Sequence, residues 1–188
     1  MTWIARAFDA LHGPRLFEII WRLLTRDRAL SETEFKAASS VLGASAIRYS
    51  DVRVADGGLL WLIFKFNKRR AFATFHTINI PGSGAHSRSY LAVVAHELTH
   101  VYQFELTGSI YIWQALRAQW SSGYRYGGWR QLEKDWSKGK HFGDYNREQQ
   151  GQIAQDYYSR VVAKGLSAED PVYQAYEPFI NELRNGEL

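Results

Sequence analysis

The chain has 188 residues, of which 46% are hydrophobic and 22% charged, and this excludes a disordered or repetitive polymer and predicts a folded domain. The net charge of +4 is modest, and we expect no nucleic-acid partner. The absence of cysteine excludes disulfides, thiolate metal sites and a cysteine nucleophile. Any metal ion must therefore be bound by histidine nitrogens and carboxylate oxygens.

The N-terminal part of the chain predicts two helices. Pro14 suits a first helical turn, and the apolar stripe over residues 16–24 has the spacing of an amphipathic helix that is too short to span a bilayer. Ser31 and Glu34 have the spacing of a capping box for a second helix, which ends near Gly43. No signal peptide is visible, so we expect a cytoplasmic protein with no membrane insertion, while export by a non-classical route stays open.

The middle of the chain changes to the pattern of strands. Three runs rich in β-branched and aromatic residues cover 47–54, 59–66 and 71–80, and turn-forming residues separate them. These runs predict a three-stranded antiparallel meander. The basic cluster at Lys65 and residues 68–70 is then interpreted as a solvated hairpin end.

Helical spacing returns after the strands. Helices are predicted over 89–106, 110–119, 146–163 and 171–183, whereas the aromatic, glycine-rich residues 120–145 fit no element.

The order of helices, small sheet and helices predicts an α+β fold. We expect a single domain over residues 1–188. N-terminal helices occupy 1–45, the sheet and the long helix 46–108, and a mainly helical part 109–188.

The long helix carries the sequence His-Glu-Leu-Thr-His at residues 96–100. Positions four apart lie on one face of a helix, so the imidazoles of His96 and His100 are able to bind the same ion. Glu97 lies about 100° further round the helix, where its carboxylate is able to approach the metal without binding it. The pattern predicts two nitrogen ligands and a general base.

A catalytic zinc site needs a third protein ligand. A third histidine in the same motif is excluded, because Gln103 and Leu106 occupy the later positions. A glutamate from a later helix is the alternative, and Glu148 is preferred because Gln152 and Asp156 follow it on the same face as second-shell partners. The other acidic candidates are Glu133, which ranks next, and Glu105, Glu169, Glu177 and Glu182.

Residues 96–103 and 148–158 together resemble bacterial gluzincin-type metallopeptidase domains, which occur as effectors on type VI secretion spike proteins and in related contractile-injection proteins. The resemblance covers about residues 75–160. The family pattern usually carries alanine where Gly151 stands.

This resemblance implies a zincin-like fold, in which a small antiparallel sheet packs on the helix that carries the motif. It implies a Zn²⁺ ion bound by His96, His100 and Glu148, with Glu97 as the base.

The resemblance also implies that the edge strand, residues 71–80, lies above the active-site helix and pairs with an extended peptide. His76 on that strand is then a candidate substrate contact. A donor for the oxyanion is needed beside the metal, and we take Tyr157 as the catalytic candidate. Tyr158, His141, Tyr145 and Arg147 are the alternatives.

The leading hypothesis is a zinc-dependent peptidase with a protein or peptide substrate. The resemblance implies a delivered effector toxin, with a secretion spike protein and an immunity protein as partners. One alternative is a metal-dependent amidase acting on the cell wall, with the tryptophan-rich residues 113–136 as a sugar platform; the competing interpretation of that segment is core packing. The other is a catalytically inactive metal-binding interaction protein.

Overall fold

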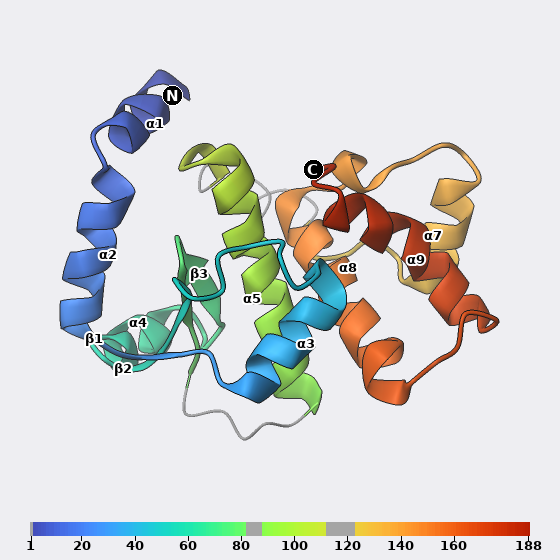
Figure 1. The fold of residues 1–188 in the computed structure, drawn as a ribbon, viewed down its shortest axis with the longest axis horizontal. Helices are drawn as coiled ribbons and strands as arrows, with labels where there is room; N and C mark the ends of the chain where they lie inside the picture. The colour runs from blue at the N-terminus through green and yellow to red at the C-terminus, as the bar shows by residue number, and fades with distance from the viewer. Residues whose placement is uncertain (1, 82–87, 112–122) are drawn as a thin grey trace.

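The computed structural model describes residues 2–81, 88–111 and 123–188, and it confirms an α+β fold. Helix α5 lies in the centre, with the sheet, α1, α2 and α4 on one side and α7, α8 and α9 on the other (Figure 1). The helices are α1 (Thr2–Ala10), α2 (Gly13–Leu24), α3 (Glu32–Leu42), α4 (Leu60–Phe66), α5 (Arg88–Thr107), α7 (Trp129–Trp136), α8 (Arg147–Arg160) and α9 (Pro171–Arg184), with short 3-10 turns η1 (Phe142–Asp144) and η2 (Val162–Lys164).

The sheet has four strands in the order β1-β2-β4-β3. Strands β1 (Thr25–Ala29) and β2 (Arg53–Gly58) are antiparallel, as are β3 (Phe72–Thr74) and β4 (Thr77–Asn79). Strands β2 and β4 pair in parallel, so the sheet is mixed. Strand β3 is an edge strand and packs against α5.

The predicted antiparallel meander is wrong. The run over 59–66 forms helix α4, because Leu60 and Phe64, four residues apart, are the buried pair, which is a helical and not an alternating spacing. The run over 71–80 is a hairpin with a turn at Phe75, whose φ is 53°. The N-terminal segment, expected to be helical, also supplies β1.

The predicted helices are confirmed where the structure describes them. Helix α2 has proline in its first turn, and Ser31 and Glu34 form the capping box of α3. Helices α5, α8 and α9 end within a few residues of the predicted bounds. Helix α1 was not predicted, and most of the helix expected over 110–119 lies outside the described residues.

The main core lies between one face of the sheet and helices α3, α5, α8 and α9. Leu98 of α5 and Ile153 of α8 are fully buried there. A smaller core on the other face of the sheet joins Ala55 to Leu60 and Phe64 of α4, with Trp21 of α2 packed against it. Within the described ranges, no helix combines the length and hydropathy needed to cross a bilayer.

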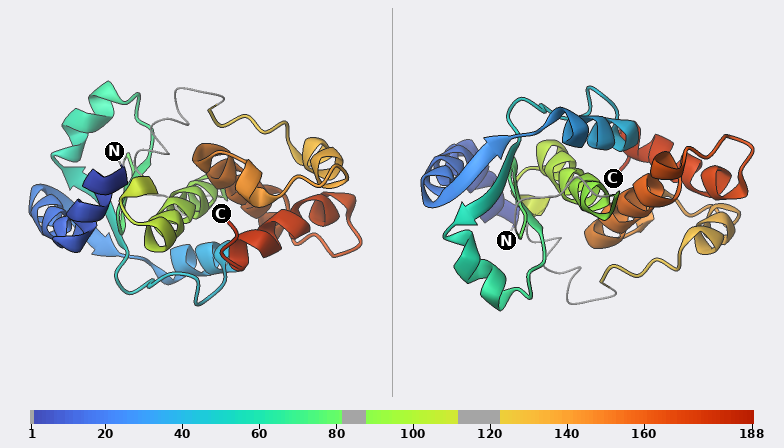
Figure 2. Two further views of the ribbon diagram at one scale, coloured as in Figure 1. Left: turned by 90° about the horizontal axis from the view of Figure 1, so that it is seen from above. Right: turned by 90° about the horizontal axis from the view of Figure 1, so that it is seen from below.

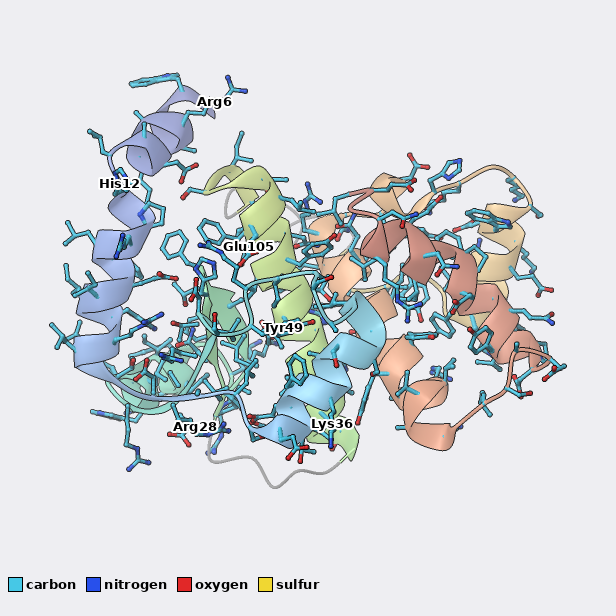
Figure 3. All side chains as sticks on the ribbon, in the orientation of Figure 1. Arg6, His12, Arg28, Lys36, Tyr49 and Glu105 are labelled. Atoms are coloured by element: carbon cyan, nitrogen blue, oxygen red, sulfur yellow. The ribbon has the colours of Figure 1, made fainter. Side chains whose placement is uncertain are left out.

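Glu34 connects α3 to β1 and α5. Its carboxylate is fully buried and accepts two hydrogen bonds of 2.7 Å from Arg28 (labelled in Figure 3), one from the Ser31 amide and one from the Tyr90 hydroxyl. Burial alone would raise the pKa of Glu34, but the hydrogen bonds from Arg28, Tyr90 and Ser31 lower it to about 2.

We expect Glu34→Gln to lower the free energy of unfolding at neutral pH by roughly 2 to 3 kcal/mol, since the partner Arg28 is partly exposed. A lowered pKa stabilises the fold above the ordinary value of 4.5, and this contribution is lost as the pH falls towards 2. The difference between parent and variant should therefore shrink near pH 3 in urea unfolding. The exposed Glu32→Gln is the control and should cost less than about 0.5 kcal/mol at either pH.

Candidate metal centre

His96, His100 and Glu148 form a buried cluster between α5 and α8. One ligand atom from each residue lies within 4.8 Å of the other two. The Oε2 atom of Glu148 is 3.6 Å from Nε2 of His96 and 3.5 Å from Nε2 of His100. This arrangement arises because the two histidines occupy successive turns of α5 and Glu148 lies in the first turn of the neighbouring α8.

The cluster fits a bound metal ion. Two ligand atoms of a tetrahedral zinc ion, each about 2.0–2.2 Å from the metal, lie roughly 3.4 Å apart. The 3.5 and 3.6 Å separations match that value and exceed an ordinary hydrogen bond. Two imidazoles and one carboxylate, all buried, are also the donor set of many catalytic zinc sites. The identity of the metal is not shown by these distances.

Charge within the cluster is paired. Burial alone would raise the pKa of Glu148, but His100 and His96 lower it well below its ordinary range. Burial opposes protonation of His100, yet Glu148 raises the pKa of that imidazole to about 9.

A chain of side-chain amides orients His100. Its Nδ1 lies 2.8 Å from Oε1 of Gln103, and Nε2 of Gln103 donates to Oε1 of Gln150 over 2.8 Å. The amide of Gln150 in turn donates to the carbonyl of Phe142. Because Gln103 accepts at this position, Nδ1 of His100 carries a proton, which leaves Nε2 as the nitrogen able to bind a metal ion.

Gly151 allows α8 to approach the ring of His96. A Cβ atom at this position would lie 2.9 Å from both Cε1 and Nε2 of His96, closer than side chains pack. An alanine at this position would therefore require the His96 ring to shift.

We expect Gly151→Ala to weaken metal binding about 10- to 100-fold, because the added methyl group displaces the His96 imidazole. Alanine is the better helix former, so the α8 backbone itself should not lose stability. Zinc affinity measured by competition with a chromogenic chelator checks this. Gln152→Ala, on the same helix, is the control and should bind zinc like the parent; equal affinity in the Gly151→Ala chain would contradict the expectation.

Glu97 lies next to the cluster and is not one of its members. Its side chain is buried, and its Oε2 atom has no hydrogen-bond partner in the described part of the chain. Burial raises the pKa of Glu97, and the nearby His96 and His100 oppose this effect. An unpaired buried carboxylate oxygen beside a metal cluster is well placed to hold a reacting water.

Two tyrosines that sequence reasoning did not assign to the site line the cluster. The ring centroids of Tyr124 and His96 lie 5.7 Å apart, and those of Tyr111 and His100 lie 5.9 Å apart. Burial raises the pKa of Tyr124 to about 12, with Glu148 and Glu97 adding to the effect. Tyr111 donates to the carbonyl of Ala73 in the edge strand β3.

Tyr157, the candidate oxyanion donor, does not reach the cluster. Its hydroxyl donates to Glu177 of α9 over 3.3 Å, and its ring lies beneath the guanidinium of Arg184. Nine residues separate Tyr157 from Glu148, which puts them on opposite sides of α8. Tyr124 replaces Tyr157 as the candidate donor, since the hydroxyl of Tyr111 already donates to Ala73.

His76, the candidate substrate contact, lies in the β3–β4 turn and faces away from the cluster. Its Nδ1 is 2.9 Å from Glu18 of α2, and its Nε2 is 3.0 Å from Glu105 of α5. Figure 3 shows Glu105 on the side of α5 that faces α2. Burial opposes protonation of His76, but Glu18 and Glu105 raise its pKa. His76 thus connects α2 to α5, and the structure does not bring it to the metal cluster.

The remaining candidates from the sequence that the structure describes contact residues outside the metal cluster. Gln152 and Asp156 bond to each other, and Asp156 accepts from Tyr126, so they do not support Glu148 as predicted. Of the tryptophan-rich segment, Trp113 and Trp120 lie outside the described residues, whereas Trp129 packs on the core and Trp136 on Phe179 and His141. Tyr145 donates to Asp135, His141 pairs with Glu182, and Arg147 bonds to Gln150.

Comparisons with protein-family models, with curated proteins and with solved structures found no match. The gluzincin resemblance therefore stays a prediction that depends on the two motifs.

Proposed function

We propose that the protein is a zinc-dependent peptidase. The observation that carries this proposal is the convergence of His96, His100 and Glu148 beside the buried carboxylate of Glu97, whose Oε2 atom has no hydrogen-bond partner among the described residues. Zinc held by the three ligands supplies Lewis acidity towards a carbonyl group and towards water. Metal-binding alone does not require Glu97, so its position favours catalysis over a purely structural site.

Side chains of the protein supply proton transfer and oxyanion stabilisation. Glu97 takes a proton from the attacking water and passes it to the leaving amine. Tyr124, whose ring lies beside that of His96, is the candidate hydrogen-bond donor to the developing oxyanion.

Strand β3 offers a place for the substrate backbone. It is at the edge of the sheet and packs on α5, so an extended peptide is able to add to it as a further strand. Tyr111 bonds to the β3 carbonyl of Ala73, which ties this edge to the wall of the metal cluster. This arrangement favours peptide over a sugar chain as substrate.

Metal removal tests the proposal. The purified chain should contain zinc by elemental analysis and hydrolyse an unfolded protein. Treatment with 1,10-phenanthroline should abolish the hydrolysis, and added Zn²⁺ should restore it. Release of fragments from peptidoglycan, without proteolysis, would identify the amidase instead. A zinc-loaded chain that hydrolyses neither would be the inactive metal-binding protein.

A further inference from the structure

The layer formed by α2 and α4 exposes large apolar side chains. These helices cover the face of the sheet that is turned away from α5, at the end of the molecule opposite α7 and α9 (Figure 2). On α4, Trp61 is 67% and Phe66 77% exposed, and on α2 no residue is buried and Leu23 is 81% exposed. Apolar side chains gathered on one surface mark an interaction site.

A basic turn follows the apolar residues of α4. Lys65, Lys68, Arg69 and Arg70 are all exposed. The side chains of Lys65, Lys68 and Arg69 form no ion pair with the described residues, and Arg70 lies over the ring of Tyr124 at 5.9 Å. The sequence contains no aspartate or glutamate between Asp56 and Glu97, so α4 and its basic turn carry only positive charges.

The apolar and basic side chains share a concave surface. A hollow of about 760 Å³ lies between α4 and the end of β2. Trp61 lines it together with Lys65, Lys68 and Arg69. Asp56 is the acidic residue of the lining, and its carboxylate lies 3.6 Å from Nε of Arg26. An aromatic ring beside several cations is the combination that binds a phosphate headgroup at the boundary of a lipid bilayer.

We propose that α4 and its basic turn dock the protein onto the surface of an anionic lipid bilayer. Trp61 and Phe66 enter the boundary between headgroups and acyl chains, while Lys65, Lys68 and Arg69 contact lipid phosphates. The helix lies in the plane of the bilayer and does not span it. Because Arg70 contacts Tyr124, the docked turn lies beside the metal cluster, and docking brings that cluster close to the bilayer surface.

Charge favours a bilayer over a second copy of this chain. A two-fold interface through this surface would bring Lys65, Lys68 and Arg69 towards their equivalents in the other copy, where they would repel. An anionic bilayer instead supplies negative charge to Lys65, Lys68 and Arg69, which form no ion pair with the described residues.

Vesicle co-sedimentation tests the proposal with the full chain. The parent should bind vesicles of phosphatidylcholine containing about one third phosphatidylglycerol, bind pure phosphatidylcholine far less, and dissociate in high salt. Lys68→Glu/Arg69→Glu should weaken binding to the anionic vesicles about tenfold or more. Trp61→Ser/Phe66→Ser should also weaken it, by removing the side chains that enter the bilayer.

A matched control separates local from overall charge. Lys134→Glu/Lys138→Glu makes the same change in net charge on exposed residues of and just after α7, and it should bind vesicles like the parent. Equal weakening by both charge-reversal variants, or no binding to anionic vesicles, would overturn the proposal. So would a dimer in light scattering that Trp61→Ser/Phe66→Ser dissociates, if it occurs without vesicle binding. Circular dichroism of each variant verifies its fold.

Discussion

A Glu97→Gln protein is expected to bind zinc as the parent does and to hydrolyse protein at least about 100-fold more slowly. Glutamine has the shape of glutamate but accepts no proton at neutral pH. Glu97 is not a member of the ligand cluster, so its replacement should leave the three ligands in place. Elemental analysis and the initial rate of proteolysis measure the two effects separately.

The kinetic pattern identifies the role of Glu97. Loss of a base that acts only in the transition state lowers kcat with little change in KM. A Glu97→Gln protein with full activity would show that Glu97 is not the base. A protein that instead loses its zinc would show that Glu97 helps to bind the metal.

Glu148→Gln is expected to lower zinc affinity by at least about 100-fold, a larger loss than removal of a residue that only orients a ligand. The substitution replaces an anionic donor by a neutral amide and leaves two imidazoles, one ligand fewer than catalytic zinc sites use. Competition with a chromogenic chelator measures the affinity. The similar size of glutamine keeps the packing between α5 and α8.

Glu133→Gln is the matched control for Glu148→Gln. Glu133 is the second acidic candidate from the sequence, and the structure places it exposed on α7. Its replacement should leave zinc affinity unchanged. If Glu133→Gln weakened zinc binding and Glu148→Gln did not, the ligand assignment would be wrong.

Features that depend on local sequence could be predicted. The capping box at Ser31 and Glu34 sets the start of α3 whatever surrounds it, and the spacing of His96 and His100 puts both rings on one face of α5. Glu148 was also reached from the sequence, because a carboxylate in the first turn of a later helix was already expected as the third ligand.

Features that depend on contacts between distant segments could not be predicted. Strands β2 and β4 pair in parallel although α4 and β3 lie between them in the sequence, and no short-range pattern specifies this pairing. Gln103 and Gln150 meet only because α5 and α8 pack together, and Tyr124 reaches the cluster from a loop for which the sequence predicted no element. No spacing in the sequence selected Tyr157 from the five candidate donors, and its place nine residues after Glu148 puts it on the opposite side of α8.

The ligands of the metal centre come from two helices that form much of the main core. A bound ion would therefore act as a crosslink between residues 100 and 148, and its binding energy would add to the stability of the folded chain. At a free metal concentration about 1,000 times the Kd, this gain is about 4 kcal/mol, a large share of the stability of an ordinary domain. The lifetime of the protein would then depend on the metal content of its compartment, and chelation would expose the chain to degradation.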